Sequence, residues 1–236
     1  MKGSILVTGV YLSNQENNIK NIIEEVRKTT EWNVTQKWIS IDGSAEESSV
    51  RNFTVLNFEL GTPKFVVLNR LLSTELLDSY DFLIISDDDI SLPSDFLDRY
   101  LSIVVKHDFA IAQPARTHGS YIDHHFVEQL AGLEARRTRF VEIGPLFSVR
   151  RDVYPVIFPF DESVYMGWGY DFVWPCLMEK LNKRMGIVDA TPVEHSMRKS
   201  VKNYNYDDAK KSMDQYLSRN PHLSRGEAFR ILESFA

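Results

Sequence analysis

Residues 80–90 of the chain read YDFLIISDDDI, an apolar run that ends in three consecutive aspartates. The apolar part, residues 80–86, is short and continuous, which predicts a strand covered on both faces at the centre of a sheet. In open α/β sheets, ligands bind beyond the carboxyl ends of the strands. This stretch therefore predicts an α/β fold with a ligand site at Asp87, Asp88 and Asp89.

The rest of the chain alternates between strand and helix patterns. Strand patterns occur at residues 4–12, 33–42, 53–60, 109–113 and 185–189. Helical spacing or capping signals occur at residues 14–28, 64–77, 94–107, 128–137 and 172–182, and two more predicted helices, 207–218 and 224–235, form a C-terminal helical tail. Strands that alternate with helices predict an α/β domain with a mixed, mainly parallel sheet flanked by helices.

Composition excludes several classes of protein. The 236 residues carry 27 Lys and Arg against 33 Asp and Glu, a net charge of −6, which argues against a general nucleic-acid surface. The single cysteine, Cys176, cannot form an internal disulfide. No apolar run approaches the ~20 residues of a spanning helix and no signal-peptide pattern is present, so we expect a cytoplasmic protein. The basic residues toward the C-terminus leave peripheral membrane association open, beside an ordinary solvated helix face; they are Arg198, Lys199, Lys202, Lys210 and Lys211.

The three aspartates indicate a cation site. Adjacent carboxylates repel one another, and a divalent cation relieves that repulsion. Alternate residues of an extended chain project to one side, so Asp87 and Asp89 can share one target. A hard metal ion held by oxygen ligands can then bridge to a diphosphate. The alternative is a solvated turn before a helix, where Asp is also favoured.

Two later segments carry further candidates. In Gly167–Trp168–Gly169–Tyr170–Asp171 the glycines allow close backbone approach to a ligand, and Trp168 offers a flat face to a sugar ring. Asp171 is a candidate general base; it is also well placed as the N-cap of the following helix. His195 follows the last predicted strand and suits Mn²⁺ beside carboxylates, although a lone histidine is more often structural.

Together these pieces resemble the GT-A type of glycosyltransferase, and in particular its family-2-like members. A closer resemblance, over residues 4–195, is to a plant and bacterial glycosyltransferase-like family catalogued as a domain of unknown function. The segments that carry it, in order, are KFVVLNRLL (64–72), YDFLIISDDDI (80–90), IAQPA (111–115), VEIGPLFSVR (141–150), GWGYD (167–171) and residues 186–195. The match is imperfect at Tyr170, where the family-2-like pattern has an acidic residue.

The resemblance implies a role for each matching residue. Asp87, Asp89 and His195 would hold Mn²⁺ or Mg²⁺, and Asp171 would deprotonate the acceptor hydroxyl. The residues implied to bind the nucleotide are Thr8, Tyr11, Asp42, Lys64, Asp87 and Asp88. Those implied to bind the sugars are Glu142, Trp168 and Gly169.

The expected protein is thus a metal-dependent glycosyltransferase that moves a sugar from a nucleotide-sugar, by family habit UDP-linked, to a glycan hydroxyl with inversion. A catalytically silent nucleotide- or glycan-binding domain is one alternative, and an Asp-x-Asp phosphatase is another. Because the motifs spread from Thr8 to His195, we expect one domain over residues 1–203 and a helical extension, 204–236, packed on it.

Overall fold

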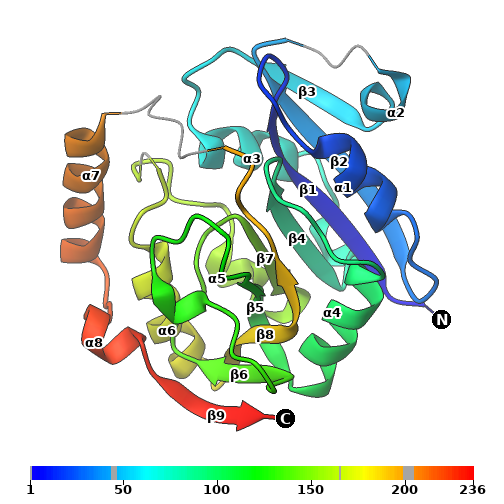
Figure 1. Ribbon diagram of the computed structural model, residues 1–236. Helices are drawn as coiled ribbons and strands as arrows, with labels where there is room; N and C mark the ends of the chain where they lie inside the picture. The colour runs from blue at the N-terminus through cyan, green and yellow to red at the C-terminus, as the bar shows by residue number, and fades with distance from the viewer. Residues whose placement is uncertain (1, 44–46, 165, 199–204) are drawn as a thin grey trace.

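A nine-stranded sheet forms the centre of the molecule. The computed structural model describes residues 2–43, 47–164, 166–198 and 205–236, and in them the strand order is β3-β2-β1-β4-β7-β5-β8-β6-β9 (Figure 1). The strands are β1 (Ser4–Leu12), β2 (Asn33–Ile41), β3 (Thr54–Phe58), β4 (Phe82–Asp87), β5 (Phe109–Arg116), β6 (Ala135–Thr138), β7 (Leu146–Arg150), β8 (Arg184–Val193) and β9 (Ile231–Phe235). Strands β1 to β4 are all parallel, and antiparallel pairing begins where β7 joins β4.

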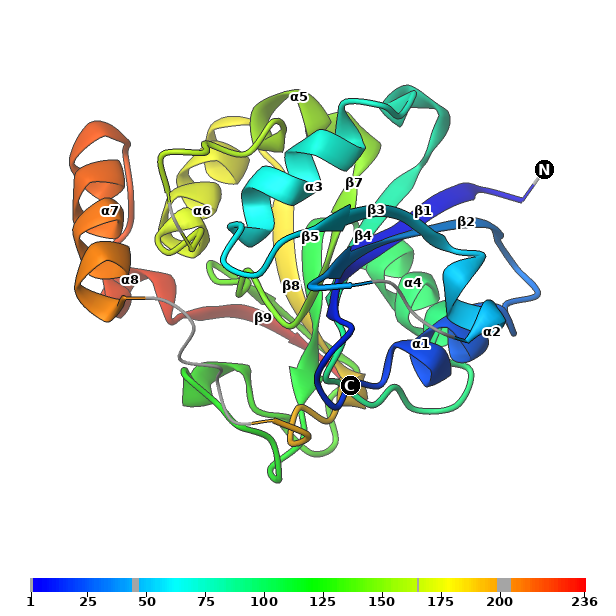
Figure 2. The same ribbon diagram turned by 90° about the horizontal axis from the view of Figure 1, so that it is seen from above.

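Helices cover both faces of this sheet. They are α1 (Ile19–Val26), α2 (Ser48–Arg51), α3 (Lys64–Leu72), α4 (Phe96–Lys106), α5 (Tyr154–Ile157), α6 (Tyr170–Lys180), α7 (Tyr206–Arg219) and α8 (Arg225–Ala228). Helices α3, α5 and α6 lie over one face, and α1 and α4 over the other (Figure 2). Successive side chains of β4 point to opposite faces of the sheet. Leu83 and Ile85 pack in the core under α3, α5 and α6, and Ile84 packs in the core under α1 and α4. The predicted α/β class, with a mixed sheet flanked by helices, is confirmed.

Two predicted helices are wrong. Residues 128–137 form a loop that leads into strand β6, and residues 224–235 form the single turn α8 followed by strand β9. Strand β9 pairs antiparallel with β6, which in turn pairs with β8. Both strands are short, and their partners are distant in sequence, so no local periodicity marks them.

The C-terminal segment is packed on the rest of the molecule. The Phe235 ring stacks on the His107 ring with 3.9 Å between centroids, and the backbone N–H of Glu134 donates to Phe235 O at 2.7 Å. The expected boundary between residues 203 and 204 lies outside the described residues. Among the described helices, none is long and apolar enough to cross a membrane.

The sheet order puts the position of the ligand crevice of open α/β sheets at the end of β1. From β1 the chain moves outward to β2 and β3, then returns to β4 on the opposite side of β1. The loops after β1 and β4 therefore diverge, which is the position where open α/β sheets bind ligands. The two ends are tied by the Leu12 N–H, which donates to Asp88 Oδ2 at 2.7 Å.

Candidate functional site

A cavity of about 590 Å³ gathers residues from distant parts of the chain. Asp87 enters it from the end of β4, His195 from beyond β8, and Glu142 from the loop before β7. Trp168 and Asp171 enter from the turn that begins α6. Gly169 also lines it. The structure thus brings together residues that the sequence motifs singled out separately.

Asp171 owes its position to the glycines before it. Gly169 has a φ of 102° and caps α6, so the helix begins at Tyr170 and Asp171 is its second residue rather than its N-cap. Gly167, with a φ of 74°, lies against Phe65; a Cβ there would be 2.1 Å from the ring. The carboxylate of Asp171 is only 7% exposed, and its Oδ1 has no hydrogen-bond partner within the described residues. Burial raises the pKa of Asp171 to about 7, against the opposing pull of the backbone N–H groups of Gly169, Asp171 and Phe172.

Glu142 lies beside Asp171 and is paired with a buried arginine. Arg116, the last residue of β5, donates to Glu142 Oε2 and to the Gly144 carbonyl, the latter at 2.8 Å. Burial raises the pKa of Glu142 to about 8; the Arg116 charge opposes this, and the Asp171 and Asp123 carboxylates add to it. Among the residues that line the cavity, carboxylates outnumber the basic side chains, which are Arg116, Lys210 and Arg225. The cavity therefore favours a proton, a cation or hydroxyl donors.

The three aspartates point to different partners. Asp87 forms an ion pair with Lys64 at the start of α3. Asp88 is 3% exposed and accepts hydrogen bonds from the Leu12 N–H and from Arg198. Burial raises the pKa of Asp88 to about 6, although the Arg198 charge and the Leu12 N–H act to lower it. Asp89 Oδ1 lies 3.2 Å from His195 Nε2, and Asp89 Oδ2 lies 3.3 Å from Arg198 Nη2.

The pair Asp89–His195 is the best candidate for holding a cation. Burial alone would raise the pKa of Asp89, but the His195 hydrogen bond and the nearby positive charges outweigh it and lower that pKa. A carboxylate oxygen and an imidazole nitrogen are donors that Mn²⁺ accepts. No group of three His, Cys, Asp or Glu side chains in the described part of the chain is arranged around one metal position. The donor types fit an ion whose remaining ligands come from elsewhere, such as Asp87 or a bound diphosphate.

Arg116 fixes the proton on His195. Its Nη1 lies 3.2 Å from His195 Nδ1, and a guanidinium has only donors, so Nδ1 accepts and the proton of the neutral ring is on Nε2. That proton faces Asp89. Ligation of an ion by Nε2 requires this proton to leave, and Arg116 must give up its bond if Nδ1 then carries it.

The predicted nucleotide residues lie at different depths. Thr8 and Tyr11 have exposed fractions of 0% and 1%, and the Tyr11 hydroxyl bonds Thr54 Oγ1 at 2.8 Å. Neither is among the residues that line the cavity. Asp42, at the end of β2, is exposed and accepts from the Asn14 amide. Lys64 pairs with Asp87, which lines the cavity.

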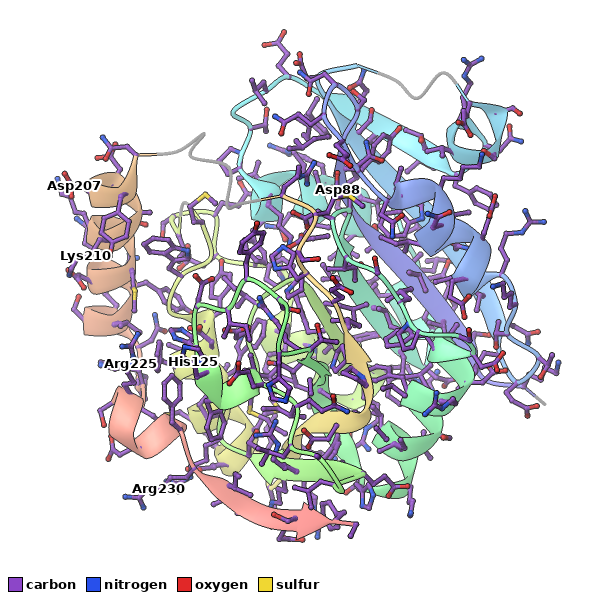
Figure 3. The ribbon with its side chains drawn as sticks, in the orientation of Figure 1. Asp88, His125, Asp207, Lys210, Arg225 and Arg230 are labelled. Carbon is purple, nitrogen blue, oxygen red and sulfur yellow. The ribbon has the colours of Figure 1, made fainter. Side chains whose placement is uncertain are left out.

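Sequence reasoning missed the residues whose roles depend on tertiary contacts. The sequence does not distinguish Arg116 from other charged residues, and its one signal is that it ends a mostly apolar strand. Arg198 was read with the basic tail, yet it lies against Asp88 and Asp89 near the end of β4; Figure 3 labels Asp88 there. Lys210, from the same basic set, pairs with Asp214 at 2.6 Å. Lys199 and Lys202 lie outside the described residues.

Comparisons with known proteins give the family of the chain. A family model described as "Protein of unknown function (DUF707)" matches residues 14–145, more than half of the chain. The chain belongs to that family. A search of the curated proteins found no match.

Solved structures give the fold. The crystal structure of GalNAc-T7 with UDP, GalNAc and Mn²⁺ is similar at a TM-score of 0.63 and 12% identity, over 92% of this chain and 48% of that one. The chain thus spans about half the length of that protein. S. aureus TarS 1–349 in complex with UDP-GlcNAc is similar at 0.58 and 13% identity, over 96% of this chain and 69% of that one. A mycobacterial protein is similar at 0.55 and 14% identity, over 95% and 77%. This DUF707 chain therefore has the GT-A glycosyltransferase fold.

Proposed function

We propose that the chain is a glycosyltransferase that moves a sugar from a nucleotide-sugar to a hydroxyl acceptor. The observation that carries the proposal is the buried Oδ1 of Asp171, which has no hydrogen-bond partner among the described residues, in a cavity that Asp87 and His195 also line. A general base needs such an oxygen within reach of the reacting hydroxyl. The fold, shared with UDP- and UDP-GlcNAc-bound proteins, supports a nucleotide-sugar as the donor.

The donor would lie across the crevice between β1 and β4. We assign Asp42 to the nucleoside, because it is exposed at the end of β2, and Lys64 to the diphosphate, because it heads α3 beside Asp87. Thr8 and Tyr11 receive no donor contact through their side chains in this proposal, since both side chains are buried. UDP is the proposed nucleotide, by analogy with the neighbouring structures.

Asp89 and His195, with Asp87, would hold Mn²⁺ or Mg²⁺ in the presence of the diphosphate. When bound, such an ion neutralises the charge that develops on the leaving diphosphate. Lys64 pairs with Asp87 and Arg198 with Asp89, so both add positive charge beside these carboxylates. The protein therefore supplies fixed countercharge where the leaving group departs.

Asp171 would act on the acceptor in the same cavity. Its Oδ1 takes the acceptor proton as the acceptor oxygen bonds to the anomeric carbon and the bond from that carbon to the phosphate oxygen breaks. Because its pKa is about 7, the ionised form is available near neutral pH. Attack opposite to the leaving group gives a product with inverted configuration. Trp168, Gly169 and Glu142 line the space where the sugars would lie.

A binding experiment tests the donor and the cation. Thermal-shift screening of UDP-, GDP-, CMP- and ADP-sugars with Mn²⁺ names the nucleotide, and calorimetry with Mn²⁺ or with EDTA then measures its affinity. We expect UDP to bind with Mn²⁺ and to weaken by more than about tenfold in Asp89→Ala. Asp78→Ala, which changes an exposed aspartate before β4, is the matched control and should bind as the wild type. Equal UDP affinity in EDTA would remove the cation from the proposal.

A turnover experiment tests Asp171. UDP release is followed with methyl pyranosides as acceptors, and NMR of the product reads the anomeric configuration. Asp171→Asn should keep UDP binding and lose release by about a hundredfold or more, while wild-type release should rise with pH through about 7. Retained release in Asp171→Asn excludes this residue as the base. Binding of UDP-sugars without release from any donor and acceptor would leave a binding domain instead.

A further inference from the structure

The C-terminal segment forms one wall of the cavity. Helix α7 contributes Tyr206, Lys210, Met213 and Asp214, which are spaced so that they share one helical face. Arg225, at the start of α8, closes the same side; Figure 3 labels Lys210 and Arg225 on these two helices. This wall lies beyond residues 14–145, the part of the chain that the family model matches.

Contacts at the start of α6 fix the position of α7 relative to Asp171. Tyr216 packs edge-to-face on Tyr170, with ring centroids 5.2 Å apart. Met213 and Leu217 lie against Gly169, where an added Cβ would meet them at 3.4 and 3.2 Å. Because Gly169 and Tyr170 immediately precede Asp171, the helix and the proposed base are held as one unit.

Two aromatic rings that line the cavity contact each other beside this wall. Trp168 and Tyr206 are 5.3 Å apart between centroids, at 69° to each other. Tyr206 is nevertheless 62% exposed, so most of its ring faces solvent. Tyr and Trp side chains each carry an apolar ring face and a polar group. The Lys210–Asp214 ion pair lies on the same face of α7 as Tyr206. A pyranose ring has the complementary chemistry, with C–H groups for the ring faces and hydroxyls for the polar side chains.

We propose that Tyr206 and Trp168 form the subsite that binds a pyranose ring of the acceptor, so that the C-terminal segment determines acceptor specificity. This inference rests on the proposed function, because it assigns the acceptor side of the same cavity. The sugar would lie on the two rings and present a hydroxyl toward Asp171, while the nucleotide would lie near Asp87 and His195, which line the same cavity.

A purely structural role for Tyr206 makes a different prediction. If the ring only anchored α7 on Trp168, its removal would lower the melting temperature and weaken donor and acceptor binding alike. A subsite role changes acceptor binding alone. The test therefore measures the two ligands separately.

The experiment uses the full chain with saturating UDP and Mn²⁺. Methyl pyranosides of glucose, galactose, mannose and N-acetylglucosamine are titrated, and saturation-transfer NMR reads ring-proton contacts and Kd. We expect Tyr206→Ala to raise the Kd of the bound glycoside by about threefold to tenfold, with UDP affinity unchanged. Tyr206→Phe, which keeps the ring, should bind as the wild type. Lys211→Ala, an exposed change on the same helix outside this cavity, is the matched control.

Every other outcome contradicts either the subsite or the proposed function. Unchanged glycoside binding in Tyr206→Ala overturns the subsite, as does equal weakening of UDP and glycoside with a lowered melting temperature. If the wild type binds UDP and none of the glycosides, the subsite is also wrong while the donor site stands. If the wild type binds no UDP at all with Mn²⁺, the proposed function itself fails.

Discussion

Asp171 shows how function and stability oppose each other at one residue. Burial of its side chain disfavours the charged form, so its pKa lies near 7 instead of the ordinary value of about 4. A base must nevertheless be ionised. The first backbone N–H groups of α6 offset part of the cost, and the unpartnered Oδ1 is left for a ligand.

This cost makes stability depend on pH in a defined direction. Because the folded pKa is raised, the folded state binds more protons between about pH 4 and pH 7, and stability falls as pH rises through that window. Asp171→Asn is neutral throughout, so its melting temperature relative to the wild type should increase from about pH 5 to about pH 8, by roughly 5–10 °C. Differential scanning calorimetry of both proteins measures it. A difference in melting temperature that stays constant across this pH range would contradict a raised pKa of Asp171 in the folded state.

At the scale of elements, the sequence predicts best where a pattern is local. Apolar runs and their spacing predict the strands β1, β2 and β4 and the helices α1 and α3. The site motifs can be recognised because they adjoin the ends of such elements. Strand β6 could not be found in this way, because its Arg136 is 2% exposed and pairs with Asp189, a contact that only the folded sheet creates. Strand β9 likewise exists through its pairing with β6.

Removal of the Phe235 ring should therefore weaken the whole edge of the sheet. The ring is partly buried and stacks on His107, so Phe235→Ala should lower the free energy of unfolding by about 1–2 kcal/mol. Leu232→Ala, on the same strand with a 43% exposed side chain, should cost within about 0.5 kcal/mol. Urea denaturation of the three proteins gives both values. Equal effects of the two substitutions would show that β9 is not anchored through Phe235.

At the scale of the molecule, the candidate site is a product of the complete fold. Asp87 comes from the parallel half of the sheet, Glu142 and His195 from the mixed half, and Tyr206 from the C-terminal segment. Sequence motifs located the first three, because each adjoins a recognisable strand. Arg116, Arg198 and Tyr206 could not be located, since their partners lie 26, 110 and 38 residues away along the chain. The resemblance implies a nucleotide role for Thr8 and Tyr11, which lie on opposite faces of β1, and the cover on both faces of the sheet buries both side chains.

A site distributed in this way predicts that the chain unfolds as one unit. Trp32 and Trp38 report the N-terminal half, Trp168 and Trp174 report the region around α6, and far-UV circular dichroism reports the entire sheet. We expect fluorescence and circular dichroism to give coincident urea transitions, because one continuous sheet joins β3 to β9 and no segment can leave without exposing a strand edge. UDP with Mn²⁺ should shift both midpoints equally, since mass action stabilises the folded state as a whole. Separate midpoints, or a ligand shift seen by only one probe, would instead divide the chain into independently stable units, with the donor crevice and the C-terminal wall in different ones.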